Sequence, residues 1–195
     1  MLMVLVASTR PGRVGLPIGE WFHGLAVRHG GFDAELVDLA AINLPLLDEP
    51  AHPRLRQYTH RHTREWSERV DGADAFVFIT PEYNFGMTAP LKNAIDYLFQ
   101  EWQHKPVGFV SYGGIAAGTR AVQMLKQVVT SLKMVPLLES VMIPFVQRLF
   151  DDQGQFQPTE AMEATGRALL DELARWQEAL APLRTLGPQR PTSTR

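Results

Sequence analysis

The chain has 195 residues, 45% hydrophobic and 21% charged, which is typical of a globular protein with a sizeable core. Its formal net charge of −2 gives no reason to expect nucleic acid or an anionic membrane as a partner. Because it contains no cysteine, disulfides, a thiolate nucleophile and a thiolate metal site are excluded. No stretch approaches the roughly 20 apolar residues that span a bilayer, so we expect a cytoplasmic protein.

Apolar, β-rich segments alternate with segments of helical periodicity. The predicted strands span residues 2–7, 35–39, 75–79, 107–112 and 140–146. The predicted helices span residues 14–29, 55–70, 90–102, 117–133 and 159–181. This alternation predicts βαβ units and a mostly parallel sheet with helices on both faces. Five strands in this order favour a doubly wound α/β fold of the flavodoxin-like type, with the strand order 2-1-3-4-5.

The pattern predicts one domain over residues 1–184, since no repeat or linker interrupts it. The chain ends in "GPQRPTSTR", which is polar and rich in Pro and Thr, so we expect residues 185–195 to be a disordered tail. The histidines of "HRH" at residues 60–62 should face apart on a helix with no carboxylate cluster nearby. We therefore expect a solvated helix face there and no metal site.

Three predicted loops have an unusual composition. They follow the first, third and fourth strands and read "STRPGRVG" (8–15), "TPEYNFGMTAP" (80–90) and "SYGGIAAGTRA" (111–121). In an open parallel sheet, ligands bind beyond the carboxyl ends of the strands, where the winding reverses. For this strand order the three loops meet at that point, so we expect a binding site there.

The first loop suits a phosphate group. Ser8 supplies a hydroxyl, Arg10 and Arg13 supply charged donors, and Gly12 and Gly15 let the backbone approach a ligand. The helix that follows adds free N–H groups and the positive end of its dipole. Arg10 follows the strand end more closely, so we expect it to contribute more. The alternative is a Gly/Pro turn with two solvated arginines. Because the P-loop and dinucleotide-binding glycine motifs are absent, a mononucleotide phosphate is favoured.

The other two loops suit a flat ring. Tyr83, Asn84 and Phe85 offer two aromatic rings and an amide, while Gly113 and Gly114 allow a sharp turn with exposed N–H groups. Taken alone, the last loop could equally be a loose strand-to-helix turn. A phosphate cradle beside a flat aromatic slot nevertheless predicts a site for flavin mononucleotide (FMN).

In this order and spacing, "ASTRPGRVG", "PEYNFGMTAPLKNAIDYL" and "SYGGIAAGTRA" resemble the NADPH-dependent FMN reductase family over roughly residues 2–150. The resemblance implies FMN and NADPH as cofactors. It implies contacts to the FMN phosphate from Ser8, Arg10 and Arg13, beside Gly15. It implies contacts to the flavin ring from Pro81, Glu82, Tyr83, Asn84 and Phe85. It also implies contacts to the pyrimidine end of the ring from Ser111, Gly113 and Gly114. The chain reads Ala117-Gly118 where many members have two glycines.

The resemblance further implies an oxidoreductase. We hypothesise that hydride passes from NADPH through bound FMN to a small acceptor (a flavin, a quinone or an azo dye) by a ping-pong mechanism. The flavin carries the chemistry, so no catalytic side chain is required, and N–H groups of Gly113 and Gly114 would stabilise negative charge at the pyrimidine end. A flavodoxin-like electron carrier and a flavin-dependent redox sensor are the alternatives, although carriers of that kind are strongly acidic.

The resemblance also implies a homodimer or homotetramer that pairs through "LKNAIDYLFQEW". In this segment Leu91, Ala94, Ile95, Leu98 and Phe99 form an apolar stripe at helical spacing, which is either an interface or ordinary core. The segment "LPLLDEP" at residues 44–50 either edges the substrate pocket or is simply a Pro-bounded loop.

Overall fold

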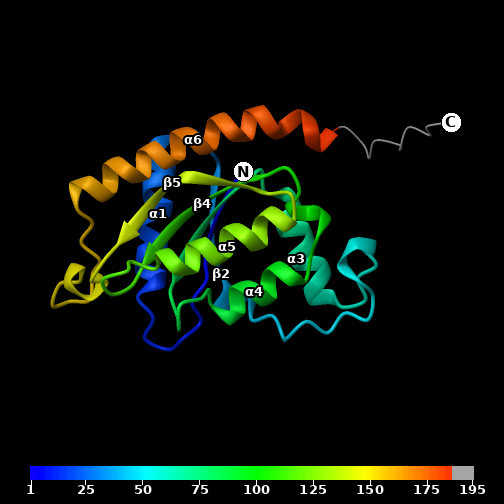
Figure 1. Ribbon diagram of the computed structural model, residues 1–195, viewed down its shortest axis with the longest axis horizontal. Coiled ribbons are helices and arrows are strands. Elements are labelled where there is room, and N and C mark those ends of the chain that lie inside the picture. Colours follow the sequence, from blue (N-terminus) through cyan, green and yellow to red (C-terminus); the bar gives the residue numbers. More distant parts are fainter. Residues whose placement is uncertain (186–195) are drawn as a thin grey trace.

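The computed structural model describes residues 1–185 and contains one parallel sheet with the predicted strand order, β2-β1-β3-β4-β5. The strands are β1 Leu2–Val6, β2 Ala34–Asp38, β3 Ala75–Pro81, β4 Pro106–Tyr112 and β5 Val135–Ile143. The longer helices are α1 Gly15–His29, α3 Arg61–Gly72, α4 Ala89–Asp96, α5 Thr119–Ser131 and α6 Glu160–Thr185. Shorter turns are α2 Leu39–Ile42, η1 Pro53–Leu55, η2 Gln100–Trp102 and η3 Val146–Leu149. Helices cover both faces of the sheet (Figure 1).

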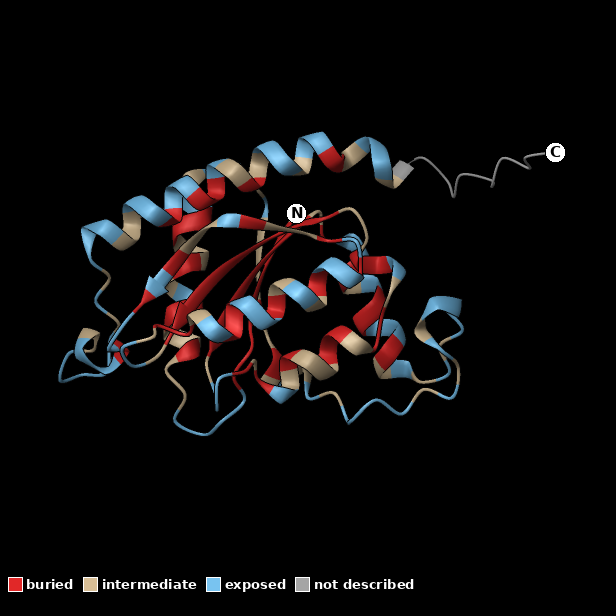
Figure 2. Ribbon diagram, viewed as in Figure 1, coloured by how far each residue is buried: buried red, intermediate tan, exposed pale blue. Residues whose placement is uncertain are grey.

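The alternation of side chains along each strand divides the core between the two faces of the sheet. On β1, Met3 and Leu5 pack with α3, α4 and α5, whereas Leu2, Val4 and Val6 pack with α1 and α6. The strands β1, β3 and β4 are buried along their whole length (Figure 2). This burial on both faces explains why they read as continuous apolar runs in the sequence.

Several helix and strand boundaries differ from the prediction. The helix expected from residue 55 begins at Arg61, because the chain first forms η1, which Arg56 ends in a left-handed conformation (φ 51°). The helix α4 ends at Asp96, and Trp102 turns into the core within η2. The strand β5 starts at Val135, and α6 continues past residue 181 with Pro182 inside it.

The apolar stripe on α4 and the residues after it is ordinary core. Leu91, Ala94, Ile95 and Leu98 are each at most 1% exposed, and Phe99 packs against the same cluster. Of the two interpretations left open by the sequence, this burial supports the core and leaves the stripe unavailable to a partner. Within residues 1–185, no helix has both the length and the apolar character needed to cross a membrane. The predicted tail falls almost wholly on residues 186–195, outside the described part.

The segment "LPLLDEP" is an exposed loop that α4 and α3 hold in place. Asn93 donates to the Pro45 carbonyl (2.7 Å) and accepts from the Leu47 N–H (2.9 Å). The Asp48 carboxylate lies 2.9 Å from His62 Nε2, and the His62 and His60 rings stack 5.2 Å apart. The prediction that these histidines face apart was wrong, because His60 precedes the helix in extended conformation and its ring stacks on that of His62. Among the described residues, no group of three or more His, Asp or Glu side chains is placed to hold a metal ion.

Candidate functional site

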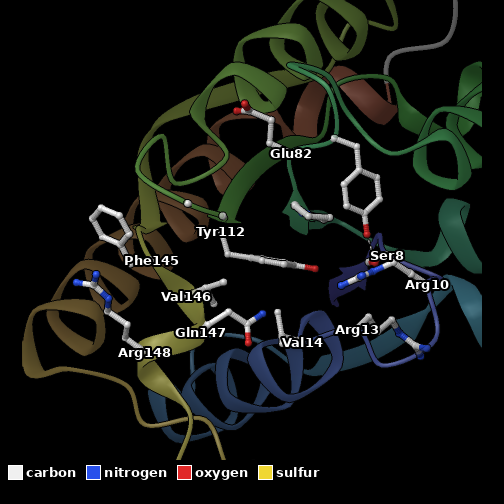
Figure 3. A pocket seen from close by; sticks show the side chains of 14 residues that line it. Ser8, Arg10, Arg13, Val14, Glu82, Tyr112, Phe145, Val146, Gln147 and Arg148 are labelled. Atoms are coloured by element: carbon white, nitrogen blue, oxygen red, sulfur yellow. Dashed lines mark hydrogen bonds between the residues drawn. The ribbon is translucent and has the colours of Figure 1, made fainter.

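The three loops of unusual composition meet at the carboxyl edge of the sheet. A cavity of about 380 Å³ lies between them, and its lining includes Ser8, Arg10, Arg13, Pro81, Glu82, Tyr83, Gly113 and Gly114 (Figure 3). A second cavity of about 410 Å³ shares Glu82, Gly113 and Gly114 with the first and adds Asn84 and Phe85. The structure therefore brings most of the predicted residues together. Gly15 and Ser111 line neither cavity.

The two arginines of the first loop are placed differently. Arg10 is exposed and its side chain is directed toward Ser8 (Figure 3). Within residues 1–185, no hydrogen bond or ion pair engages its guanidinium. Arg13 instead points away from the cavity and pairs with Asp38, with side chains 18% and 17% exposed. Asp38 also accepts from the Ala40 N–H (3.0 Å) at the start of α2. Arg13 thus fastens the loop to the end of β2, and Arg10 is the guanidinium available to an anion.

Gly15 and Ser111 lie behind the cavity wall. Gly15 is the buried first residue of α1, and a methyl group there would collide with the Tyr112 hydroxyl. Tyr112 is only 4% exposed, and neither its hydroxyl nor that of the fully buried Ser111 has a hydrogen-bond partner in the described part of the chain. Burial raises the pKa of the Tyr112 hydroxyl above its ordinary value, so this group stays a neutral donor at physiological pH.

The second loop is a tight turn rather than an open connection. The backbones of Tyr83 and Gly86 exchange two hydrogen bonds of 3.0 and 2.9 Å. Between them, Asn84 (φ 49°) and Phe85 (φ 69°) both adopt left-handed conformations, as in a type I′ turn. A bulky residue is strained in this region, so the turn is held by its surroundings. One such contact joins the Tyr83 hydroxyl to the Ser8 Oγ at 2.9 Å, which links the second loop to the first.

Arg120, at the start of α5, holds the second loop from the other side. Its N–H donates to the Glu82 carboxylate (3.1 Å), and its guanidinium pairs with the same carboxylate. It also lies 3.7 Å from the centroid of the exposed Phe85 ring. Burial opposes ionisation of Glu82, but the hydrogen bonds and charge of Arg120 outweigh it and hold the pKa of Glu82 below its ordinary value. Glu82 is thus an ionised carboxylate whose charge is balanced by Arg120, rather than a free acid or base.

The third loop turns through two left-handed residues, Ala117 (φ 51°) and Gly118 (φ 80°). Gly118 is needed there, because a Cβ would lie 3.0 Å from the Tyr112 backbone. Ala117 adopts its conformation at a cost of about 1 kcal/mol. The prediction for the N–H groups of this loop needs a correction. The Gly113 N–H already donates to the Ile143 carbonyl (3.2 Å), which leaves Gly114 as the candidate donor.

A fourth wall of the cavity was missed by the sequence analysis. It consists of Phe145, Val146, Gln147 and Arg148, which follow β5. The N–H groups of Phe145 and Val146 donate to the carbonyls of Gly114 and Gly113, both at 3.1 Å, so this wall is fixed to the third loop. Arg148 lies over the Phe145 ring, 4.7 Å from its centroid. The available signal was an aromatic residue and an arginine after a strand; Val14 and Tyr112 were also missed.

A parallel sheet with this winding and a cavity at its switch point defines a flavodoxin-like protein. The chain belongs to the NADPH-dependent FMN reductase family, whose sequence profile matches residues 1–148. It is 40% identical to an NAD(P)H-dependent FMN reductase of Schizosaccharomyces pombe over 162 residues, 80% of each chain. It is 32% identical to an NADPH:quinone oxidoreductase of Arabidopsis thaliana over 111 residues, 55% of this chain and 52% of the relative.

Among solved structures, the chain resembles FerB, a flavoenzyme NAD(P)H:(acceptor) oxidoreductase from Paracoccus denitrificans. The TM-score is 0.73 at 21% identity, and the alignment covers 91% of this chain and 97% of FerB. At this level of identity the similarity to FerB shows a shared fold. The predicted family and flavodoxin-like fold are thereby confirmed. At the level of the family, so is the prediction of an oxidoreductase that uses FMN and NAD(P)H.

Proposed function

We propose that this protein passes two electrons from NADPH through bound FMN to a small acceptor such as a flavin, a quinone or an azo dye. The observation that carries the proposal is the composition of the cavity. One end offers Arg10, whose side chain has no partner within residues 1–185, and Val14, the residue that precedes α1. The other end offers the Tyr83–Phe85 turn opposite Gly113 and Gly114. We assign the FMN phosphate to the first end and the flavin ring to the second.

The residues present fit this ligand. A phosphate monoester carries about −1.5 to −2 charges near neutral pH, which suits a guanidinium beside the positive end of a helix dipole. Buried polar groups are nearly always hydrogen-bonded in proteins, so the Tyr112 hydroxyl, which lines the cavity and meets no hydrogen-bond partner within residues 1–185, points to a polar ligand at this edge. The turn at Tyr83–Gly86 also explains why this loop is longer than a simple connection: it forms one wall of the site.

In this proposal the chain binds and orients its ligands, and bound FMN supplies the redox chemistry. The carboxylate in the cavity lining, Glu82, is neutralised by Arg120 and is therefore unsuited to proton transfer. The N–H of Gly114, which has no backbone partner within residues 1–185, would donate to a negatively charged ring edge. Arg13, through Asp38, keeps the first loop in place, and Arg10 contacts the phosphate.

Stopped-flow mixing of the FMN-loaded protein with NADPH under argon tests the proposal. We expect the oxidised flavin absorbance to bleach without any added reductase. An electron carrier or a redox sensor would keep its yellow colour, and that result would contradict the proposed function.

Steady-state turnover over a panel of flavins, quinones and azo dyes then tests the ping-pong mechanism. Two substrates that use one flavin face in turn should give parallel double-reciprocal lines. Clearly intersecting lines would mean that donor and acceptor bind together. We further propose a cytoplasmic protein that forms a homodimer or homotetramer; both proposals rest on composition and family resemblance.

A further inference from the structure

We propose that the Tyr112 hydroxyl donates a hydrogen bond to the phosphate of FMN, which makes Tyr112 a residue that selects FMN over riboflavin. This inference rests on the proposed function, because it requires FMN in the cavity with its phosphate at the first loop. It adds a contact to the phosphate from Tyr112, at the end of β4. The sequence analysis associated the loop after this strand only with the flavin ring.

The first observation is a buried hydroxyl that forms no well-aligned hydrogen bond within residues 1–185 and has the Ser8 hydroxyl as a polar neighbour. Tyr112 belongs to the apolar cluster between the sheet, α1 and α6, and within residues 1–185 its hydroxyl has no hydrogen-bond partner. Figure 3 shows its ring crossing the cavity, with the hydroxyl directed toward Ser8 and Arg10. A buried hydroxyl is costly to leave unpaired, and this one lies at the end of the cavity where the charged donors gather.

The second observation is the position of this hydroxyl over the start of α1. It lies so close to Gly15 that a methyl group there would overlap it. In the described structure no side chain caps this helix, and its first turn contains no acidic residue. The N–H groups of a first helical turn lack intrahelical partners and favour an anion. Glycine as the first residue of α1 therefore lets a tyrosine hydroxyl and helix N–H groups converge on one point.

The third observation is the set of neighbouring groups. The Ser8 hydroxyl is already bonded to Tyr83, and Arg13 is paired with Asp38. Arg10 is the remaining cation in the first loop, and Tyr112 is the remaining buried hydroxyl facing it. A phosphate has three acceptor oxygens, so it can accept from Arg10, the helix start and Tyr112 at once. Riboflavin lacks this group and would leave the Tyr112 hydroxyl unpaired.

The test is the Tyr112→Phe variant, which keeps the ring and removes only the hydroxyl. We expect FMN affinity, measured by quenching of flavin fluorescence, to fall about ten- to a hundredfold, as for a hydrogen bond to a charged group. Riboflavin affinity should stay within about twofold. The melting temperature of the flavin-free protein should hold or rise, because an unpaired buried hydroxyl is removed. A purely structural role for the tyrosine predicts a lower melting temperature instead.

Two further variants complete the experiment. Tyr58→Phe is the matched control, because it removes a hydroxyl bonded to Glu101 (2.8 Å) outside the cavity lining and should leave both flavin affinities unchanged. Gly15→Ala should weaken FMN in the wild-type background and less so together with Tyr112→Phe, since the methyl group then meets no hydroxyl.

An unchanged FMN affinity in Tyr112→Phe would overturn the inference while leaving the proposed function intact. Equal losses for the two ligands would overturn it as well, because the hydroxyl would then act on the ring or the fold. If the wild-type protein itself shows no preference for FMN over riboflavin, the phosphate placement in the proposed function fails, and the inference fails with it.

Discussion

Replacing Arg10 with alanine should weaken FMN and leave riboflavin almost unchanged, whereas replacing Arg13 should affect both ligands alike. The difference follows from the partners of the two side chains. Arg10 is exposed and, within residues 1–185, has no ion-pair partner, so its charge is available to a phosphate. Arg13 is mostly buried against Asp38, so its removal loosens the loop that carries Ser8 and Arg10.

The expected magnitudes can be worked from these environments. A hydrogen bond to a charged group contributes about 1.5–3 kcal/mol, and 1.4 kcal/mol is a factor of ten. The Arg10→Ala variant should therefore bind FMN roughly ten- to a hundredfold more weakly. Breaking a fully buried ion pair costs about 3–5 kcal/mol. Because Arg13 and Asp38 each keep some exposure, we expect a loss of about 1–3 kcal/mol in the free energy of unfolding for Arg13→Ala.

Titrations with FMN and riboflavin, followed by flavin fluorescence, and thermal melts of the flavin-free proteins separate the two roles. Arg175→Ala on the exposed side of α6 controls for the loss of one positive charge. Asp38→Asn keeps an oxygen for the start of α2 but removes the charge, so it should reproduce the lower stability of Arg13→Ala. The reasoning is refuted if Arg10→Ala weakens both ligands equally, or if Arg13→Ala selectively weakens FMN as strongly as Arg10→Ala does.

Three further predictions concern the turn at the cavity rim, a buried lysine and assembly. Phe85→Gly should be more stable than Phe85→Ala by about 1 kcal/mol in chemical unfolding, because glycine adopts φ 69° without strain and alanine does not; equal stabilities would show that the turn is relaxed. Burial lowers the pKa of Lys105 from 10.5 to about 8. Between pH 8 and 10.5 the unfolded chain therefore keeps the Lys105 proton that the folded chain loses, so the unfolding free energy of wild type relative to Lys105→Met should rise over this range. A difference in melting temperature between the two proteins that does not change with pH would contradict this. Light scattering at micromolar concentration should show a dimer or tetramer, and a monomer would remove that proposal.

The strands were predictable where they are buried on both faces. The runs "LMVLV" in β1 and "AFVFI" in β3 are continuous and apolar, and both strands lie within two residues of their predicted ends. The edge strand β5 exposes Leu138 and Met142 and contains an irregular register against β4, so its pattern is mixed and its start was placed five residues too late. The early end of α4 depends on Trp102 packing beside Trp66 and Phe76, a tertiary contact that helical periodicity does not encode.

The site was predictable to the extent that topology determines it. Once the strand order is known, the loops after β1, β3 and β4 must share an edge, and their composition then indicates the ligand. The partner of Arg13 could not be predicted this way. It depends on the register of β1 against β2, which places Asp38 opposite Val6, two residues before the first loop. The wall after β5 was missed because the binding site was located from the switch point between β1 and β3, and β5 lies at the edge of the sheet, away from that point.

The rim of the cavity contains two phenylalanines whose backbone conformations are strained. Two phenylalanines have left-handed backbones in the described part of the chain, Phe85 (φ 69°) and Phe145 (φ 46°), and both line a cavity. Each carries an arginine guanidinium over its ring, Arg120 at 3.7 Å and Arg148 at 4.7 Å from the centroid. A cation–π contact at an exposed site contributes about 0.5–1 kcal/mol, less than the roughly 1–3 kcal/mol that such a backbone conformation costs. These contacts therefore offset only part of the strain, and the hydrogen bonds that join the loops must hold the rings at the rim. A relaxed turn would be more stable there, so the placement of both rings is best explained by the ligands that the cavity binds.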